Sequence, residues 1–185
     1  MKRLFDFVAA GCGLLLLCPL FLLLTLAVVV DSGFPVLFRQ VRVGRGGRDF
    51  RLAKFRTMTV LKEAEKGSFD AGCTRRVTTV GRFLRKTKLD ELPQLWNVVV
   101  GDMSLVGPRP EVRQWVEVYP ERWARVHTMR PGITDPASIV YRNEEELLAA
   151  AEDPEAFYRD EILPRKLALY EAYVRGRSFW SDIGI

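Results

Sequence analysis

The sequence predicts a mainly helical α+β protein that is attached to a membrane near its N-terminus. Three observations lead to this class. An uncharged apolar run covers residues 7–30, two short alternating segments follow between residues 36 and 57, and helix-like segments with proline breaks recur from residue 79 onward. The first segment is long enough to reach across a bilayer, while the rest has the composition of a globular domain.

Composition limits the kinds of partner. The chain has 185 residues, enough for one domain with its own core, and a formal net charge of +5 with a pI of about 9.3. That charge suits an anionic partner: nucleic acid, a membrane surface or a phosphorylated substrate. Cys12, Cys18 and Cys73 give no disulfide framework, so we expect a reducing compartment for the soluble part. The single His127 argues against zinc and leaves a hard, oxygen-ligated ion such as Mg²⁺.

The apolar run from Phe7 to Val30 has three interpretations. As one continuous helix it would be ~36 Å long, so it could be a transmembrane span. It could also be a cleaved signal peptide, but no small-x-small cleavage site follows Val30 and the run is long for such a peptide. The third interpretation is a re-entrant hairpin that enters and leaves the bilayer on one side.

Two features favour the hairpin, although the residues alone leave a kinked span open. Pro19 stands at the centre of the run, where proline removes a helix hydrogen bond and bends the axis. Each half would then be roughly 16 Å long, about half the hydrocarbon thickness. Both flanks are basic, with Lys2 and Arg3 before the run and seven Arg or Lys residues between positions 39 and 56. Basic flanks prefer the cytoplasm, and a simple span would carry one of them across.

A β-hairpin is predicted after a turn at residues 31–35. Residues 36–43 and 49–57 alternate apolar side chains with arginines, and residues 44–47 supply a glycine-rich turn. The basic face of this hairpin is interpreted as either solvated or resting on anionic lipid headgroups. Lys54 and Arg56 lie closest to the next segment and are candidates for phosphate binding.

The later segments are predicted from their periodicity and their breaking residues. Phe83 and Leu84 would either enter a membrane interface or pack on the protein core. Arg175, Arg177, Phe179 and Trp180 have the basic and aromatic composition of a membrane-interface segment. The elements predicted after the β-hairpin are a polar loop at 61–74, an amphipathic helix at 79–86, a helix at 111–126 divided by Pro120, a loop at 129–138, and helices at 144–158 and 160–173.

The chemistry is concentrated between residues 87 and 110, where Asp90 and Glu91 are adjacent. Proline is tolerated in the first turn of a helix, so Pro93 predicts a helix that begins near Asp90 and ends at Gly101. A start at Thr87, of capping-box type, is a second possibility. Carboxylates at a helix N-terminus among cations suit a metal and phosphate site, while an ordinary N-cap on a surface helix is equally open. The nearby cations are Arg82, Arg85, Lys86, Lys88, Arg109 and Arg113.

Six motifs in order then resemble one family. With them the chain is similar to the bacterial sugar transferases, the small monotopic phosphoglycosyl transferases, over nearly its whole length. The motifs are Lys2-Arg-Leu-Phe-Asp6, Phe38-Arg-Gln-Val-Arg-Val-Gly44, Lys54-Phe-Arg-Thr-Met58, Leu89-Asp-Glu-Leu-Pro-Gln-Leu-Trp-Asn97, Gly101-Asp-Met-Ser-Leu-Val-Gly-Pro-Arg-Pro110 and Arg130-Pro-Gly-Ile-Thr134.

The resemblance implies an architecture and a reaction. Residues 1–33 would form a re-entrant helix-break-helix hairpin kinked at Pro19. The resemblance therefore favours the re-entrant hairpin over the kinked span. Residues 34–185 would form one catalytic unit, with interfacial amphipathic helices, on the cytoplasmic face of the bacterial inner membrane. The expected reaction moves a sugar-1-phosphate from a UDP-sugar to polyprenol (undecaprenyl) phosphate. It requires Mg²⁺ and gives UMP and a polyprenyl diphosphosugar, as the first membrane step of glycan assembly.

The resemblance also assigns roles to residues. Asp90 would attack the sugar-bearing phosphorus and form a covalent phosphosugar-aspartate intermediate. Glu91 would act beside it as a metal partner or as a base, so that both carboxylates are candidate Mg²⁺ ligands. The candidates for holding diphosphate oxygens, a task that suits cations and above all arginine, are Lys54, Arg56, Arg85, Arg109 and Arg142.

Two departures from the common family pattern limit these expectations. Cys18 stands before the kink proline where many members have serine, and residues 131–138 replace a Gly-Leu-Ala-Gln-type continuation. The donor sugar therefore stays open, as does oligomerisation. Two other functions remain alternatives: a UDP-sugar hydrolase, and a non-catalytic adaptor that binds membrane lipids. A nucleic-acid partner is not expected, because no nucleic-acid-binding module is recognisable.

Overall fold

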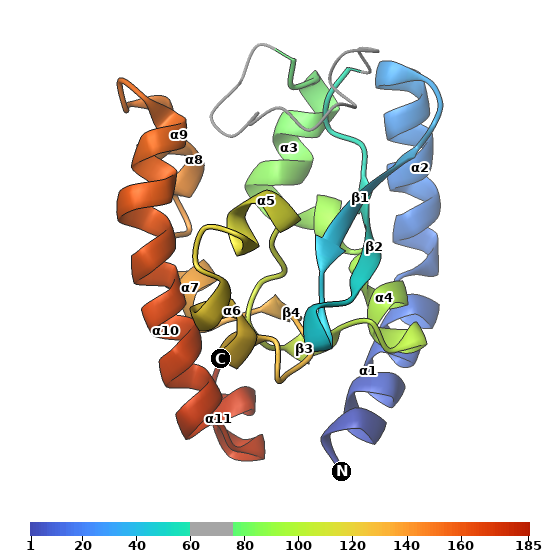
Figure 1. Ribbon diagram of the computed structural model, residues 1–185. Helices are drawn as coiled ribbons and strands as arrows, with labels where there is room; N and C mark the ends of the chain where they lie inside the picture. Colours follow the sequence, from blue (N-terminus) through green and yellow to red (C-terminus); the bar gives the residue numbers. More distant parts are fainter. Residues whose placement is uncertain (60–75) are drawn as a thin grey trace.

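The computed structural model describes residues 1–59 and 76–185. The polar loop predicted for residues 61–74 lies outside the described residues, as does Cys73. Around the gap, the protein is a mainly helical α+β structure with two small sheets at its centre, as the sequence predicts (Figure 1).

Two helices, α1 (Lys2–Leu16) and α2 (Cys18–Ser32), run along one side of the molecule (Figure 1). They are bent by 62° where they meet at Leu17, and Pro19 occupies the first turn of α2. This confirms the predicted break, because a proline in the first turn has no helix hydrogen bond to lose. Among the described helices none is long and apolar enough to cross a bilayer alone, whereas α1 and α2 together qualify by length and composition.

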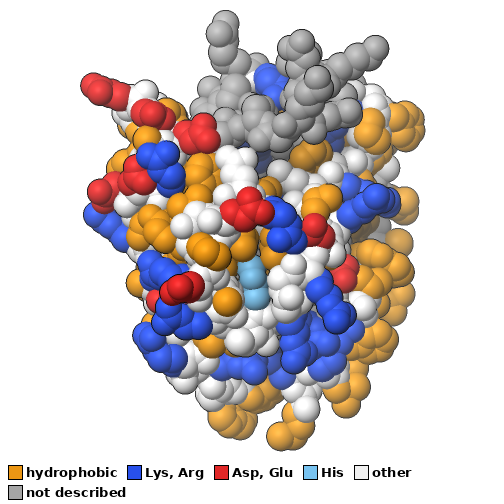
Figure 2. Space-filling view, in the orientation of Figure 1, with side chains coloured by type: hydrophobic (Ala, Val, Ile, Leu, Met, Phe, Trp, Pro, Cys, Tyr) orange, Lys and Arg blue, Asp and Glu red, His pale blue; other side chains and the backbone are white. Residues whose placement is uncertain are grey.

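The bent pair is covered by the domain on one side only. Ala10, Leu24 and Val28 are buried against the remaining elements, as expected for helices that also support a core. The apolar side chains on their other side are exposed, and they form part of the hydrophobic right-hand edge in Figure 2. Large exposed apolar surfaces on a folded chain mark contact with a partner or with lipid. The exposed residues near and beyond the bend include Leu15, Leu16, Leu22, Leu23 and Leu26.

The predicted β-hairpin is confirmed as β1 (Leu37–Val43) and β2 (Asp49–Phe55). The two strands are antiparallel and are joined by a 3₁₀ turn, η1 (Arg45–Gly47). Helix α4 (Gln94–Val100) covers the other edge of β2, because the Asn97 side chain accepts from the Ala53 N–H (3.0 Å) and donates to the Arg51 carbonyl (2.8 Å). One amide side chain therefore docks α4 onto the strand as a neighbouring strand would.

The predicted amphipathic helix is confirmed as α3 (Thr79–Thr87), with the Thr78 hydroxyl accepting from the Gly81 N–H at its start. Burial confirms the core-packing interpretation for Leu84, whereas contact of Phe83 with a membrane interface stays a prediction. Leu84 is fully buried with Leu24 and Val28 of α2, whereas Phe83 is 57% exposed.

A second sheet was not predicted. β3 (Ser104–Val106) and β4 (Gly132–Thr134) pair in parallel. The expectation of a loop throughout residues 129–138 is therefore wrong for residues 132–134, and it is also wrong for residues 136–138, where a short helix begins. The two backbones cross closely just beyond β3. A Cβ atom on Gly132 would lie 2.1 Å from the Gly107 nitrogen, so only glycine fits at this crossing.

The C-terminal half is more broken than the sequence predicts. The helix expected at 111–126 is two short helices that begin after Glu111, and the helix expected at 144–158 ends at Ala149 before a new start at Pro154. Prolines begin several of these pieces because their missing N–H costs nothing there. In order they are α5 (Arg113–Val116), α6 (Pro120–Val126), α7 (Pro136–Val140), α8 (Glu144–Ala149), α9 (Pro154–Phe157), the π-helical turn η4 (Tyr158–Ile162), α10 (Leu163–Gly176) and α11 (Phe179–Ile183).

Three hydrophobic clusters fix the centre of the molecule. The largest joins α6 to α10 around Trp123 and Tyr170. A second joins α1, β2 and α4, and a third joins α2, α3 and β2. Leu89 and Leu92 pack against the third cluster, while Leu95 packs against the second. The segment that carries Asp90 and Glu91 is therefore held from both sides.

Candidate active site

The backbone around the two carboxylates turns sharply. Lys88 ends α3 in the left-handed conformation (φ 57°), and a 3₁₀ turn, η3 (Leu89–Glu91), precedes α4. The helix predicted from Asp90 to Gly101 is thus two pieces. Neither η3 nor α4 has a side-chain cap, so the carboxylates are not used as ordinary N-caps.

Glu91 is the centre of a buried ion-pair cluster. Its Oε1 accepts from Lys54 Nζ at 2.8 Å and also from Arg109, and its Oε2 accepts from Arg109 Nη1 at 3.2 Å. Lys54 extends from the face of β2 that also carries the buried Leu52, and Arg109 comes from the loop after β3. The strand alternation and the β3–β4 crossing therefore aim two cations at one carboxylate.

The charges in this cluster shift one another. Burial alone would raise the pKa of Glu91, but Arg109 and Lys54 outweigh it and hold that pKa well below its usual range. Burial lowers the pKa of Lys54, and the neighbouring Arg109 lowers it further, against the opposing effect of Glu91 and Asp90. The pKa of Arg109 is raised despite its burial, because Glu91 favours its charged form.

Asp90 lies beside this cluster in a different state. It is only 7% exposed, and its Oδ1 is buried without a hydrogen-bond partner among the described residues. Burial raises its pKa, and Lys54 counteracts that rise only in part. A buried carboxylate oxygen without a donor is energetically costly, so such an atom in a native protein calls for a functional explanation.

Gln94, one turn further on, is a residue that the sequence argument did not single out. Its side chain is 1% exposed, and its Nε2 is likewise buried without a partner in the described part of the chain. An amide donor and a carboxylate oxygen, both unsatisfied within one turn, are suited to receive a polar ligand. No pattern of charge or periodicity marks a single glutamine, so only the packing identifies it.

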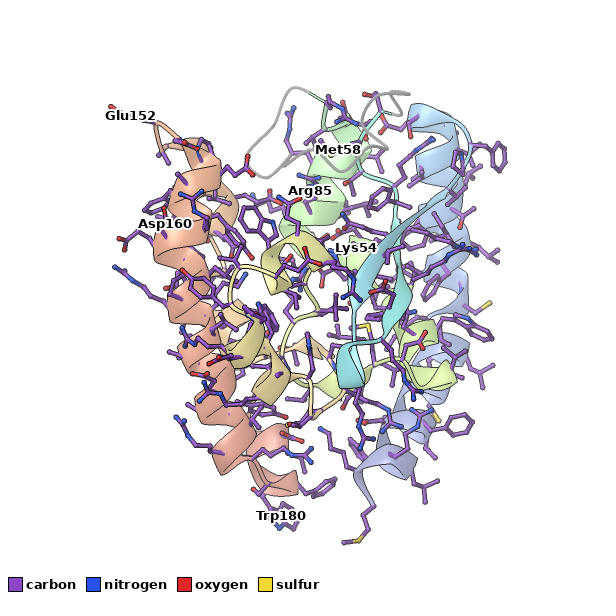
Figure 3. The ribbon with its side chains drawn as sticks, viewed as in Figure 1. Lys54, Met58, Arg85, Glu152, Asp160 and Trp180 are labelled. Carbon is purple, nitrogen blue, oxygen red and sulfur yellow. The ribbon has the colours of Figure 1, made fainter. Side chains whose placement is uncertain are left out.

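Arg85 approaches from α3. Its Nε donates to the Thr57 hydroxyl (3.0 Å), its Nη1 contacts the Glu145 carboxylate at 3.4 Å, and its charge lowers the pKa of Asp90. Lys54 and Arg85 both extend toward the middle of the molecule, between α10 on the left and α2 on the right (Figure 3). Thr57 is a second residue that was not predicted, and it orients this guanidinium.

Two of the predicted cations are not brought to Asp90. Arg56 is 5% exposed and donates through Nη2 to the Ser32 carbonyl, the Ser32 hydroxyl (2.9 Å) and the Gly33 carbonyl, which binds the end of α2 to β2. Arg142, just before α8, is exposed and makes no hydrogen bond or ion pair with the described residues. The structure therefore joins Lys54, Arg85 and Arg109 to the two carboxylates, and leaves Arg56 and Arg142 outside.

The site does not contain a ready-made metal cage. Among residues 1–59 and 76–185, no group of three or more His, Cys, Asp or Glu side chains is placed to hold a metal ion. Mg²⁺, however, is commonly bound by one or two carboxylates together with substrate phosphates and water. The Asp90 carboxylate fits that donor set, whereas Glu91 could join it only where Lys54 or Arg109 moves away.

Comparisons with known proteins identify the family of the chain. The family model of the bacterial sugar transferases matches residues 1–185, and the chain belongs to this family. It is 38% identical over 188 residues to the UDP-glucose:undecaprenyl-phosphate glucose-1-phosphate transferase of Klebsiella pneumoniae, covering all of this chain and 38% of that protein.

Two further relatives are similar over a shorter stretch. A UDP-N-acetylgalactosamine-undecaprenyl-phosphate N-acetylgalactosaminephosphotransferase of Aeromonas hydrophila is 42% identical over 144 residues, which are 76% of this chain and 34% of that protein. The uncharacterized sugar transferase EpsL of Bacillus subtilis is 48% identical over 146 residues, 77% of this chain and 70% of that protein. The chain thus spans well under half of the first two relatives.

Proposed function

We propose that this protein transfers a sugar-1-phosphate from a UDP-sugar to undecaprenyl phosphate at the cytoplasmic face of a bacterial inner membrane. Family membership and the names of the relatives support this class of reaction. The proposal places residues 1–33 in the bilayer as a re-entrant hairpin and residues 34–185 above it as the catalytic unit. The 62° bend and the exposed apolar side of α1 and α2 support the hairpin.

The observation that carries the mechanism is the buried, unpartnered Asp90 Oδ1 beside the Lys54–Glu91–Arg109 cluster. A carboxylate stripped of water and of hydrogen-bond donors is a better nucleophile than a solvated one. The adjacent cations attract the donor diphosphate and keep the repulsion between two anions small. A buried carboxylate oxygen without a hydrogen-bond partner, with cations held beside it, is what a phosphoryl-transfer site requires.

In the first half-reaction, Asp90 Oδ1 attacks the phosphorus that bears the sugar. A bond forms between that phosphorus and Oδ1, the bond from the phosphorus to the bridging oxygen breaks, and UMP leaves with the bonding electrons. In the second half, an oxygen of undecaprenyl phosphate attacks the same phosphorus and releases Asp90. Two displacements at one phosphorus replace one direct transfer between two anionic substrates.

The cations are assigned by their geometry. Arg109 and Lys54 hold diphosphate oxygens on the side of Glu91, and Arg85 reaches them from α3. Glu91 keeps Arg109 and Lys54 in place, and its low pKa makes it a poor proton acceptor, so of its two predicted roles the metal partner is favoured over the base. When bound, Mg²⁺ would be held by Asp90 and would offset the negative charge of the diphosphate.

The first experiment measures UMP. Purified protein in nanodiscs receives Mg²⁺, undecaprenyl phosphate and a panel of UDP-sugars. Release of more than one UMP per protein molecule with one or a few sugars, only when the lipid acceptor is present, establishes the transferase and identifies the donor. Catalytic UMP release without acceptor indicates a hydrolase, and unchanged cellular function after loss of both carboxylates indicates an adaptor.

The covalent step has its own test. With donor but no acceptor, the intact protein should gain the mass of one phosphosugar, and Asp90→Asn should neither gain it nor release UMP. Asp160→Asn, which removes an exposed carboxylate from η4, serves as a matched control for the loss of one negative charge. Labelling of Asp90→Asn, or turnover close to that of the wild type, would remove Asp90 as the nucleophile.

A further inference from the structure

The outer face and the turn of the β1–β2 hairpin carry four arginines whose charges are not paired within the part of the chain that the structure describes. Arg39, Arg45, Arg48 and Arg51 are all exposed, and none of their guanidinium groups makes a hydrogen bond or an ion pair with the residues that the structure describes. This contrasts with the inward-facing Arg42 on the same hairpin, whose guanidinium binds Gln40 and Glu111.

The strand register explains why these charges are together. Arg51 stands opposite Val41 and Arg39 stands opposite Ala53, so both arginines are on one face of the ladder. Arg45 and Arg48 flank the turn at its end. Asp49, an acidic residue at the same end, is paired with Arg113 at 2.6 Å and leaves the positive charge uncompensated.

The face also exposes apolar side chains. Leu37 and Val41 are 36% and 52% exposed on the same side as the two arginines, and Phe34 precedes the strand with 78% of its side chain exposed. A mixture of arginine and apolar residues matches the boundary between lipid headgroups and acyl chains. A face that contacts only water would not require exposed apolar residues such as Leu37 and Val41.

The position of the β1–β2 hairpin beside α2 favours membrane lipid as the partner of this face. Phe55, at the far end of this face, packs on Phe21 of α2, so the face is turned toward the membrane helices. Arg56 binds the end of α2 directly, and only four residues separate α2 from β1. Figure 2 shows basic side chains gathered on the right and lower right, between the centre of the visible face and the hydrophobic edge.

We infer that the outer face of the β1–β2 hairpin binds the phosphate groups of anionic phospholipids in the leaflet that holds α1 and α2. This rests on the placement of α1 and α2 in the bilayer, but not on turnover. Lys and Arg near an anionic membrane surface each strengthen binding by about fivefold at low salt. The inference therefore adds a preference for lipid charge to a protein that the apolar hairpin alone would hold in any bilayer.

The test measures lipid preference without using the reaction. Full-length protein in neutral detergent micelles is titrated with dansyl-labelled phosphatidylglycerol or phosphatidylcholine, and energy transfer from tryptophan reports bound lipid. Trp96 on α4 is exposed and provides a nearby donor. The wild type should prefer phosphatidylglycerol at least tenfold, and about 500 mM salt should remove most of that preference.

Variants locate the preference. Arg39→Gln/Arg51→Gln should weaken phosphatidylglycerol binding by tenfold or more and leave phosphatidylcholine binding unchanged. Arg159→Gln/Arg165→Gln, which removes the same charge near η4 and α10, should change neither. Thermal unfolding curves identify any variant that has lost its fold.

Three results would overturn the inference. The first is equal binding of the two lipids by the wild type, and the second is an equal loss in the hairpin and control variants. The third is displacement of phosphatidylglycerol by a short oligonucleotide at a much lower concentration than by a polyphosphate of the same charge, which would indicate a nucleic-acid surface. None depends on UMP release, so a failed transferase assay and a failed lipid assay are separate outcomes.

Discussion

At the residue scale, the described cations near the carboxylates divide into those that contact the cluster and one that supports the fold. Lys54 and Arg56 are two positions apart on the same stretch, yet Lys54 reaches Glu91 and Arg56 reaches the end of α2. Arg56 has a structural role, because it donates to three acceptors at Ser32 and Gly33 that would otherwise be buried and unpaired.

This difference predicts opposite outcomes for two similar substitutions. Arg56→Gln should lower the unfolding temperature by about 4–10 °C, because it removes charge-assisted hydrogen bonds worth about 1.5–3 kcal/mol, but should keep most activity per folded molecule. Lys54→Gln should keep the unfolding temperature within a few degrees and lose most turnover. Arg56→Gln with an unchanged melting curve and no UMP release would instead give Arg56 a direct role with substrate.

Arg109 predicts a dependence on shape rather than charge alone. It contacts both oxygens of Glu91, an arrangement that a lysine cannot reproduce. Arg109→Lys should therefore reduce kcat/KM for the donor by about 10- to 100-fold, as expected for one misplaced charge at a phosphate site. Steady-state UMP release measures this, and kinetics equal to the wild type would show that a positive charge alone suffices.

His127 predicts a component of the pH dependence of stability. Burial, reinforced by Arg113, lowers its pKa to about 4, whereas an unfolded histidine titrates near 6.5. As pH falls below about 6.5 the unfolded state takes up a proton that the folded state accepts only near 4, so the free energy of unfolding declines. The loss amounts to about 3 kcal/mol when complete.

His127→Gln should lack this component, and urea unfolding at pH 7 and pH 5 compares the two proteins. The His127 ring stacks on Trp123 at 5.1 Å, so the variant will be less stable at both values, but its loss between them should be smaller. The same loss in both proteins would assign the titration to other groups.

At the element scale, a buried carboxylate joins the hairpin to the C-terminal helices. Glu111 accepts from Arg42 of β1 (2.8 Å), from the Tyr158 hydroxyl of η4 (2.6 Å) and from the Val112 N–H (2.9 Å). Its own carbonyl accepts from Val43. The residue lies two positions after Arg109, so the same contacts hold the loop that presents Arg109 to Glu91.

Removing Arg42 should be the more damaging change. Arg42→Met leaves a buried carboxylate without its cation and should cost about 3–5 kcal/mol, whereas Tyr158→Phe removes one donor and should cost about 1–3 kcal/mol. Arg42→Met/Glu111→Gln should recover part of the loss, because the uncompensated charge is gone. Denaturant unfolding measures these variants, the single Glu111→Gln variant and the wild type. Strict additivity of Arg42→Met and Glu111→Gln would contradict the coupling.

The sequence predicted the elements that depend on residues close together in the chain, such as alternating strands and proline breaks. The alternation in residues 36–57 gave both strands within two residues, and Pro19 gave the break between α1 and α2. The β3–β4 pair escaped prediction, since strands of three residues, 25 residues apart, leave no periodic signal. In the site, Asp90, Glu91 and Lys54 could be found by type and spacing, whereas the contacts of Arg56 and Gln94 depend on segments that meet only in the folded chain.

At the scale of the whole molecule, the bent pair predicts how the chain lies in the membrane. Phe5, near the start of α1, and Phe34, two residues after α2, lie close to the two ends of the pair and are exposed. Single cysteines at these positions, in a variant without its three natural cysteines, should both react with an impermeant maleimide from the cytoplasmic side of oriented vesicles. Reaction of the two positions from opposite sides would establish a kinked span and refute the hairpin.

The attachment of Arg56 to Ser32 and Gly33 has a wider consequence for the lipid environment. These hydrogen bonds fix the end of α2 to the residue that directly follows β2, the strand that carries Lys54. A hairpin that enters and leaves through one leaflet takes its depth from that leaflet, so the height of Asp90 above the acyl chains should not vary with total bilayer thickness. Proteins that span the membrane respond to thickness by tilting or by deforming the lipid. With the proposed activity, the protein should instead keep the same turnover in bilayers of short and long acyl chains.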